Sequence, residues 1–540
     1  MDKTNRNRVK GFLKAKGTKI VNETGEEIVL TGWGVGNWLL CEGYMWVIRG
    51  DERFDRPGNI ERIVRQLVGT AYADKFWTEF RKNYITREDI RRMAEQGYNS
   101  IRIPFNWRIL MEDEPGLIWK EDGFALLDQC IDWCEEFGIY AFLDMHGAPG
   151  GQTGANIDDS NDNLPRLFMD SDSWDKAMAL WIKLAGRYKD RWIVGGYDLL
   201  NEPIRPESPR YVNCDHLVPK LVQFYDEVIA EIRKIDERHL ISIEGHHWST
   251  DPTIFYKKYD PNMVIHFHRY GCYPTLDSYR QFMEVSQRLD APLWLGETGE
   301  NYLEWFAAMV PLAVDLEIGY NLWPWKKLDC VNSPYSVKKP EGWDKITAYI
   351  QGGIHPGYEE AQRILDQLLE NIKVHNCVEN AGVSRAVFRM PGCRVRATDF
   401  DTFPGKGISY SGRRQEGNIY NFRTDTGMKF SAISNEPFKR RFGFDCGWDR
   451  LVLELEEGEF AVYGINQVSG GNTVTLELHS SEASLISLSQ DGTELFRGKL
   501  DKQDAPYEVQ KIPLKAAGKS SVGIRVLTGK IQLAALNFNL

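Results

Sequence analysis

The sequence predicts an α/β protein, a (β/α)8 TIM barrel followed by a C-terminal antiparallel β-sandwich domain. Between about residues 28 and 325, eight short apolar runs alternate with stretches of helical periodicity, the order that such a barrel requires. At 540 residues the chain also exceeds what one hydrophobic core usually organises. After about residue 371 the pattern changes to short runs in which apolar and polar residues alternate, separated by turn residues. We therefore expect the catalytic barrel with its connector helix at 1–371 and the β-sandwich at 372–540.

The eight expected barrel strands are rich in Val, Ile and Leu without strict alternation, as in strands covered on both faces. They lie at residues 28–33, 100–104, 139–145, 196–200, 240–243, 263–267, 292–296 and 319–323. For two of the intervening helices, the residues at their ends predict where the helix begins or stops. The pattern Thr86-Arg-Glu-Asp89 predicts a capping box that opens a helix ending at Gly97, and residues 124–137 have helical spacing and stop at Gly138.

Two connections are longer than compact barrels usually carry, and long loops in compact domains tend to be functional. They are residues 41–84 after the first strand and 147–170 after the third. Both leave the barrel at the carboxyl ends of its strands, so we expect them to wall in a substrate. Residues 355–373 have helical spacing and are expected to connect the two domains.

Composition excludes several kinds of partner. A formal charge of -11 disfavours nucleic acid or an anionic membrane, and no stretch approaches the length of a membrane-spanning helix. The nine cysteines include no CxxC pair and no Cys/His cluster at zinc spacing, so we expect reduced thiols, no metal and no cofactor. Residues 1–10 lack the apolar core of a secretion signal. They predict a cytoplasmic protein, or a secreted one from which a signal was removed.

Two glutamates end buried apolar runs where strands should meet loops. Glu202 lies in Asp198-Leu-Leu-Asn-Glu-Pro203, and Glu297 lies in Leu293-Trp-Leu-Gly-Glu-Thr-Gly299. The carboxyl ends of barrel strands hold the active site, so the two carboxylates are expected to face each other across the barrel mouth. A carboxylate pair in that position suits glycoside hydrolysis.

Seven motifs in this order resemble glycoside hydrolase family 5 of clan A, within it the exo-β-1,3-glucanase and β-glucosidase branch. The motifs lie between residues 32 and 326 and are Gly32-Trp-Gly-Val-Gly-Asn-Trp38, Ser100-Ile-Arg-Ile-Pro104, Asp144-Met-His-Gly-Ala-Pro-Gly150, Leu200-Asn-Glu-Pro203, His266-Phe-His-Arg-Tyr270, Gly296-Glu-Thr-Gly299 and Leu322-Trp-Pro-Trp-Lys326. The resemblance implies a retaining β-glycosidase that works without a cofactor, with Glu202 as the general acid/base and Glu297 as the nucleophile.

The same resemblance implies roles for the neighbours of the two carboxylates. Asn201 would hydrogen-bond the sugar 2-hydroxyl, a contact that strengthens in the transition state. Tyr270 and Arg102 would lie beside Glu297 and keep it ionised. The remaining expected sugar-binding side chains of these motifs are His146, His268 and Trp323.

Trp323 would form the platform under the sugar at the cleavage subsite, whereas Trp325 alternates with it and is expected to pack outward. In the glycine-rich segment 150–160, Asp158 and Asp159 are candidate binders of sugar hydroxyls. The alternative for that segment is a hydrogen-bonded Asx turn with a structural role.

The C-terminal domain resembles a family 6-type carbohydrate-binding module. The matching segments are residues 394–403, 405–407, 442–448 and 457–460. The resemblance allows two roles for this domain, sugar binding or a structural lid on the barrel.

We therefore expect an exo-acting enzyme for β-glucosides or short β-glucan oligosaccharides, with a small glycoside as its partner and no obligatory protein partner. Within the family, a β-mannosidase or a transglycosylating enzyme uses the same carboxylate pair. A non-catalytic sugar-binding protein on a barrel scaffold is the alternative from another class, and it would predict the loss of one carboxylate.

Overall fold

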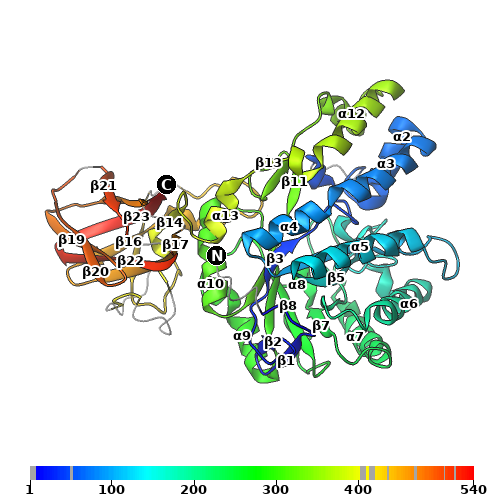
Figure 1. Cartoon of the computed structure of the whole chain (residues 1–540), viewed down its shortest axis with the longest axis horizontal. Coiled ribbons are helices and arrows are strands. Elements are labelled where there is room, and N and C mark those ends of the chain that lie inside the picture. The colour runs from blue at the N-terminus through cyan, green and yellow to red at the C-terminus, as the bar shows by residue number, and fades with distance from the viewer. Residues whose placement is uncertain are drawn as a thin grey trace.

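A computed structural model describes residues 8–48, 53–401, 409–412, 420–433, 437–467, 471–503, 505–515 and 518–540. Figure 1 shows two parts, a barrel ringed by helices and a smaller β-rich domain that contains the C-terminus. Of the segments that resemble a carbohydrate-binding module, residues 402–403 and 405–407 lie outside the described residues.

The barrel prediction is confirmed. Eight parallel strands close in the order β10-β3-β4-β5-β6-β7-β8-β9. Their bounds are β3 Thr31–Gly34, β4 Ser100–Asn106, β5 Tyr140–Gly147, β6 Val194–Asp198, β7 Leu240–Glu244, β8 Met263–Arg269, β9 Leu293–Gly299 and β10 Gly319–Trp323. A short hairpin of β1 (Lys14–Lys16) and β2 (Lys19–Val21) precedes them.

Helices cover the outside of the barrel. They are α4 Arg87–Gln96, α5 Glu121–Phe137, α6 Ser171–Tyr188, α7 Val218–Arg233, α9 Asp277–Leu289 and α10 Leu303–Asp315, whereas the four-residue α8 His246–Ser249 is a turn that follows β7. The expected capping box is present at α4, where Thr86 and Asp89 satisfy each other's backbone N–H groups. Gly97 and Gly138 end α4 and α5 in the left-handed conformation, as the sequence predicts.

The insertion after the first barrel strand is mostly helical. It forms α2 (Pro57–Val68) and α3 (Thr70–Tyr84), which pack against α12 (Tyr358–Asn371). Figure 1 shows these three helices on the side of the barrel away from the second domain. The helix expected to connect the domains is therefore present, but it packs on α2 and α3 because its apolar side matches theirs.

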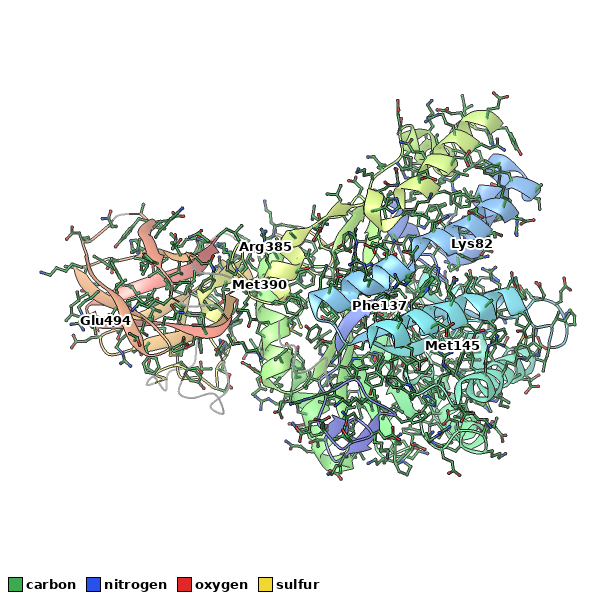
Figure 2. The ribbon with its side chains drawn as sticks, in the orientation of Figure 1. Lys82, Phe137, Met145, Arg385, Met390 and Glu494 are labelled. Carbon is green, nitrogen blue, oxygen red and sulfur yellow. The ribbon has the colours of Figure 1, made fainter. Side chains whose placement is uncertain are left out.

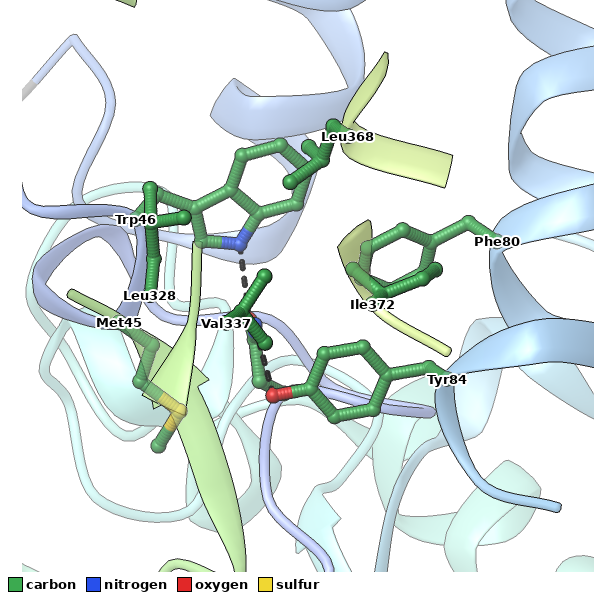
Figure 3. A pocket seen from close by; sticks show the side chains of 9 residues that line it. Met45, Trp46, Phe80, Tyr84, Leu328, Val337, Leu368 and Ile372 are labelled. Atoms are coloured by element: carbon green, nitrogen blue, oxygen red, sulfur yellow. Dashed lines mark hydrogen bonds between the residues drawn. The ribbon is translucent and has the colours of Figure 1, made fainter. Parts of the chain in front are cut away.

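A small and largely apolar hollow lies between this insertion and the side chains of Leu328, Val337, Leu368 and Ile372, the last two in and directly after α12. In it, Trp46 donates to Asn37, whose side chain in turn donates to Tyr84 (Figure 3). These contacts fix the start of the insertion, including the short helix η1 (Gly43–Trp46), close to the barrel mouth. This first part of the insertion reaches the site described below.

The chain leaves the barrel through a three-stranded sheet and several short helices. These elements are β11 Lys326–Leu328, β12 Tyr335–Val337, α11 Trp343–Ile350, β13 Val378–Glu379 and α13 Ala381–Val387. Arg385 in α13 and Met390 beyond it lie between the two parts of the molecule (Figure 2). Beside them, Arg389 donates from Nε to the carbonyl of Ala307 in α10 at 2.7 Å, so the linker is anchored to the barrel.

The C-terminal domain consists of two antiparallel sheets, as expected. One contains β15-β16-β23-β18-β21 with β14 paired to β23, and the other has the order β17-β22-β19-β20. Their bounds are β14 Arg394–Arg396, β15 Lys429–Ala432, β16 Leu451–Glu456, β17 Phe460–Gln467, β18 Thr473–His479, β19 Ser484–Gln490, β20 Thr493–Leu500, β21 Tyr507–Pro513, β22 Gly518–Thr528 and β23 Lys530–Asn539. Among the described residues no helix has the length and apolar character needed to cross a membrane.

A buried ion pair ties α4 to the end of the barrel. Lys326 Nζ lies 2.9 Å from Asp89 Oδ1, and both side chains are fully buried. Trp325 is also buried and donates to the same oxygen at 3.1 Å, so it packs away from the barrel interior as expected. Removing the carboxylate would leave a buried ammonium without its counter-charge.

We predict that Asp89→Ala lowers the free energy of unfolding by about 3–5 kcal/mol, the usual cost of breaking a buried pair on one side. Urea unfolding followed by tryptophan fluorescence measures it. Glu88→Ala is the matched control, because Glu88 pairs with Arg91 and Arg92 on the exposed face of the same turn and should change stability by less than about 1 kcal/mol. Equal small effects of both variants would contradict the role given to this pair.

Candidate active site

The two glutamates singled out in the sequence meet at the carboxyl ends of the barrel strands. Glu297 belongs to β9, and Glu202 lies in the turn that follows β6. One carboxylate oxygen of Glu202 lies within 4.8 Å of one of Glu297. Both side chains are almost completely buried, with 8% and 7% of each residue exposed. The barrel therefore places two carboxyl groups face to face, as predicted.

Each oxygen of Glu297 has its own donor. Arg102 Nη1 lies 2.6 Å from Oε2, and the Tyr270 hydroxyl lies 2.8 Å from Oε1. Burial raises the pKa of Glu297 above its ordinary value, while the charges of His268 and Arg102 act in the opposite direction. The two donors therefore stabilise the ionised form, which is the form needed in a nucleophile.

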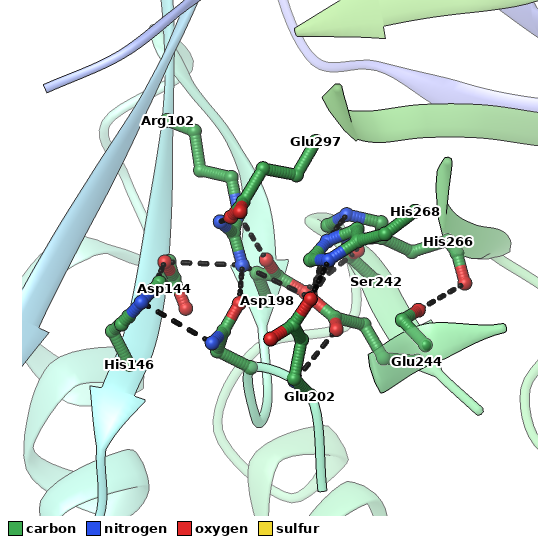
Figure 4. Close-up of polar contacts among 12 residues, drawn as sticks. Arg102, Asp144, His146, Asp198, Glu202, Ser242, Glu244, His266, His268 and Glu297 are labelled. Atoms are coloured by element: carbon green, nitrogen blue, oxygen red, sulfur yellow. Dashed lines mark hydrogen bonds and ion pairs between the residues drawn. The ribbon is translucent and has the colours of Figure 1, made fainter. Parts of the chain in front are cut away.

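Arg102 is fully buried and bridges four carboxylates of the barrel interior. Its guanidinium contacts Glu297 and three further acids, Asp144 at 3.1 Å, Asp198 at 2.8 Å and Glu244 at 3.0 Å (Figure 4). The planar fork of an arginine offers five N–H donors in fixed directions, which a lysine cannot do. One cation thus holds together the ends of strands β4, β5, β6, β7 and β9.

The backbone at Glu202 is held in an uncommon conformation. Its φ is +42°, a left-handed value that costs free energy for a residue with a side chain. Glu244 Oε2 accepts the Glu202 N–H at 2.7 Å, and this buried contact compensates part of that cost. The Glu202 side chain meets His268, whose Nδ1 lies 2.7 Å from Oε1. Glu244 and His268 together fix both the backbone and the side chain of Glu202.

His268 carries a charge that its surroundings favour. Burial opposes the charge, but Glu244 and Glu297, with hydrogen bonds to Glu202 and Glu244, outweigh it and raise the pKa of His268 well above its ordinary value. Conversely, burial works against the ionised form of Glu244, yet the charges of His268 and His266 lower its pKa. The charged form of His268 is therefore favoured. Its ring lies between the carboxylates of Glu202, Glu244 and Glu297, and its Nδ1–H donates to Glu202.

Asn201 and His146 form a second chain of contacts across the site. Asn201 Oδ1 accepts from Arg102 at 2.7 Å, and its Nδ2 lies 3.2 Å from His146 Nε2. His146 Nδ1 contacts Asp144 at 2.9 Å. Burial and the charge of Arg102 lower the pKa of His146 to about 4, so it is neutral at neutral pH. A neutral ring that donates from Nδ1 to Asp144 accepts at Nε2 from Asn201, which fixes the orientation of the amide.

Trp323 lies at the end of β10 and stacks on His146, with ring centroids 5.3 Å apart and an angle of 3° between the planes. The position of its indole requires residues without a side chain at two places in the first motif. A Cβ at Gly34 or Gly36 would approach the Trp323 ring to 2.3 and 2.5 Å, respectively. The indole N–H donates to the Tyr44 hydroxyl at 2.9 Å. The spacing of Gly32-Trp-Gly-Val-Gly36 thus makes room for the aromatic platform.

Two of the predicted binding residues are not brought to the carboxylate pair. Asp158 is fully buried and accepts backbone N–H groups of Thr153, Gly154 and Ser160, so it holds its own loop together. Asp159 accepts from three elements around it, namely the side chains of Asn106 and Arg108 and the N–H of Gly58. The structural alternative, a hydrogen-bonded turn, describes this loop better than sugar binding.

Several residues of the site were not singled out in the sequence. Glu244 is the first charged residue after the apolar run that begins at Leu240. The same pattern identified Glu202 and Glu297, so it could also have identified Glu244. Asp144 and Asp198 are charged residues inside strands that are otherwise apolar. Further acidic and basic groups come from the first insertion and from the ends of β9 and β11, and these are Glu42, Tyr44, Glu300 and Lys327.

Glu42 belongs to the short part of the insertion that reaches the site. Burial, followed by the charges of Glu297, Glu300 and Glu202, raises its pKa well above the ordinary value. Tyr44 donates to Glu300 at 3.3 Å, and Glu300 is paired with Lys327. The raised pKa favours the protonated carboxyl group, which can donate to an oxygen as well as accept from a hydroxyl.

Three groups of side chains in the described part of the chain have the spacing of metal ligands. Two of them share His268, and the third lies beyond β7; they are Glu202/His268/Glu297, Glu244/His266/His268 and His246/His247/Asp251. In the first two groups the ligand atoms already contact one another or Arg102. Their arrangement is that of an acid/base cluster.

Comparison with known proteins agrees with this geometry. Residues 66–329, just under half of the chain, match the Cellulase (glycosyl hydrolase family 5) model. The match, together with the glycosidase names of its relatives, supports a glycoside hydrolase.

A beta-xylosidase of Phanerodontia chrysosporium is 34% identical over 240 residues, which are 44% of this chain and 47% of that protein. Endoglucanase C of Acetivibrio thermocellus is 29% identical over 198 residues, which are 36% of this chain and 53% of that protein. The chain thus spans about half the length of these curated relatives. A solved structure of an endogalactoceramidase is 15% identical, with 97% of this chain and 99% of that chain covered and a TM-score of 0.46.

We predict that Glu244→Gln lowers the pKa of His268, because it removes the largest of the charges that favour the imidazolium. An NMR titration of the histidine side chains measures the shift. Ser242→Ala is the matched control on the same strand, since Ser242 contacts Asp198 and His266 but neither Glu244 nor Glu202. An unchanged His268 titration in Glu244→Gln would show that Glu244 does not set its charge.

Proposed function

We propose that this protein is a retaining β-glycoside hydrolase in which Glu202 is the general acid/base and Glu297 is the nucleophile. The observation that carries the proposal is the separation of the two carboxylates, with one oxygen of each within 4.8 Å of the other. Retaining enzymes hold their carboxyl groups about 5–5.5 Å apart, whereas inverting enzymes need about 6.5–9.5 Å to admit a water molecule.

In the first step Glu202 donates its proton to the glycosidic oxygen while a Glu297 oxygen bonds to the anomeric carbon. The bond from that carbon to the aglycone breaks, and the aglycone leaves as an alcohol. Arg102 and Tyr270 orient the attacking carboxylate. Asn201, which Arg102 holds through Oδ1, binds the 2-hydroxyl in this proposal. His268 contacts only one oxygen of Glu202, Oε1, which leaves Oε2 for the transferred proton.

In the second step Glu202, now a carboxylate, takes a proton from a water molecule. The water oxygen bonds to the anomeric carbon, and the ester to Glu297 breaks, so the sugar leaves with its original configuration. A second sugar in place of water would give transglycosylation by the same route. The arrangement of the two acids serves either acceptor.

The substrate that we propose is a β-glucoside or a short β-glucan oligosaccharide, cleaved from its end by a cytoplasmic enzyme. Glu42 and Tyr44 support the exo mode, because they bring the first insertion to the catalytic pair. The name of the endoglucanase relative supports a glucan substrate. The more similar relative is named a beta-xylosidase, which makes β-xylosides the second candidate.

We predict that Glu297→Ala abolishes hydrolysis and that azide restores turnover with inverted configuration, giving an α-glycosyl azide. A small anion can occupy the space of the missing carboxylate only if that carboxylate forms the covalent bond. Dinitrophenyl β-glucoside is the substrate, and proton NMR of the azide product gives the configuration.

Glu202→Ala serves as the matched control for the roles of the two acids. Azide should restore this variant with retained configuration, because azide then attacks the glycosyl-enzyme in place of the activated water. Inversion with the Glu202 variant and retention with the Glu297 variant would reverse the two roles.

We predict that among aryl β-glycosides differing only in the sugar, the β-glucoside has the highest kcat/KM and that labelled β-glucan oligosaccharides release single sugars from the non-reducing end. Initial rates and product chromatography measure both. A preference for the β-xyloside or β-mannoside would replace glucose in the proposal, and early internal cleavage would contradict the exo mode.

A further inference from the structure

A segment of the second domain lies on the loops that follow β8 and β9. The ring of Phe444 stacks on the ring of Tyr270, with centroids 4.7 Å apart and 25° between the planes. Tyr270 directly follows β8, and Phe444 is remote from it in the sequence, in the stretch before β16. An aromatic side chain of the C-terminal domain thus covers a residue that contacts the catalytic pair.

Neighbouring contacts fix Phe444 in place. Asn301 Nδ2 donates to the Phe444 carbonyl at 3.2 Å, and Cys446 Sγ lies 3.3 Å from the carbonyl of Cys272. Gly271 has a φ of +57°, and a Cβ there would approach the Phe444 carbonyl oxygen to 3.0 Å and its Cα to 3.1 Å. The close approach of the two domains therefore depends on a glycine directly after Tyr270.

Tyr270 is the donor to Glu297 Oε1, at 2.8 Å. Burial and the charges of Glu297 and Glu300 raise the pKa of Tyr270 well above its ordinary value, so the hydroxyl keeps its proton. The position of that hydroxyl depends on the position of the ring. Phe444 covers one face of the ring and limits the angles that it can adopt.

We propose that Phe444 is a positioning residue of the active site, through which the second domain holds Tyr270 in hydrogen-bonding contact with Glu297. The proposal rests on the proposed function, in which Glu297 is the nucleophile. It gives the C-terminal domain a part in catalysis that is distinct from sugar binding and from general stabilisation of the barrel.

The same segment contains a matched control. Phe442 packs edge to face on Tyr302, with centroids 4.7 Å apart and 87° between the planes. Tyr302 also belongs to the loop after β9, but its hydroxyl reaches Asp445 of the second domain at 3.3 Å. Phe442 and Phe444 thus make comparable contacts between the domains, and only the contact of Phe444 leads to a catalytic carboxylate.

The test compares Phe444→Leu with Phe442→Leu in the full chain, since leucine keeps apolar volume but lacks a flat face. We predict that Phe444→Leu lowers kcat/KM for dinitrophenyl β-glucoside by roughly tenfold, as for a weakened hydrogen bond to a charged group. The acid limb of its pH profile should move to higher pH, because a Glu297 carboxylate with a weaker donor has a higher pKa. Phe444→Tyr should restore both, and Phe442→Leu should change neither.

Two further measurements separate positioning from folding. Tyr270→Phe should lose as much activity as the Phe444→Leu/Tyr270→Phe double variant, since both changes remove one interaction. Hydrogen exchange of the backbone at residues 269–273 should rise in Phe444→Leu and stay unchanged in Phe442→Leu. Additive losses, or equal exchange in both variants, would overturn the proposal.

The exchange measurement also distinguishes failure of the positioning role from failure of the proposed function. If the wild-type chain cleaves none of the glycosides while Phe444→Leu still loosens residues 269–273, the proposed function fails and the positioning contact stands. If the wild type is active and Phe444→Leu matches it in rate, pH profile and exchange, the positioning role fails and the proposed function stands.

Discussion

The buried guanidinium of Arg102 is the interaction on which the site depends. It contacts Asp144, Asp198, Glu244 and Glu297, which come from four different strands. Without a cation at this point, like charges would meet in a region from which water is largely excluded, and such an arrangement is costly. The ion pairs fix Glu297 directly. They fix Glu202 indirectly, because Glu244 also accepts the backbone N–H of Glu202.

Around this centre, the contacts of Glu202 and Glu297 come from different parts of the chain. Glu202 is held by the barrel, through Glu244 and His268. Glu297 takes one donor from the barrel interior and the other from Tyr270, whose ring rests on the second domain. The match to the family 5 model ends at residue 329, before that domain begins.

The barrel strands and most of the side chains around Glu297 could be predicted from the sequence. Strands that are covered on both faces appear as continuous apolar runs, and these runs end at polar residues. The starts and ends of the eight strands were found within a few residues, and Glu202, Glu297, Arg102, Asn201 and Tyr270 meet as expected. The contacts that escaped prediction depend on distant packing. The position of α12 depends on the apolar sides of α2 and α3. The hydrogen bonds of Asp158 to backbone N–H groups of its own loop depend on how that loop folds. The contact of Phe444 with Tyr270 joins two segments that are far apart in the sequence.

The raised pKa of Glu42 has a consequence for the kind of ligand that the site attracts. Burial, followed by the charges of Glu297, Glu300 and Glu202, raises this pKa, and a positive charge placed nearby would lower it. A sugar mimic with a protonated ring nitrogen would supply that charge and favour the ionised carboxylate. Its affinity would then rise with pH as long as the nitrogen stayed protonated, whereas a neutral sugar would gain nothing from the same change. The acidic cluster therefore discriminates between ligands of the same shape by their charge.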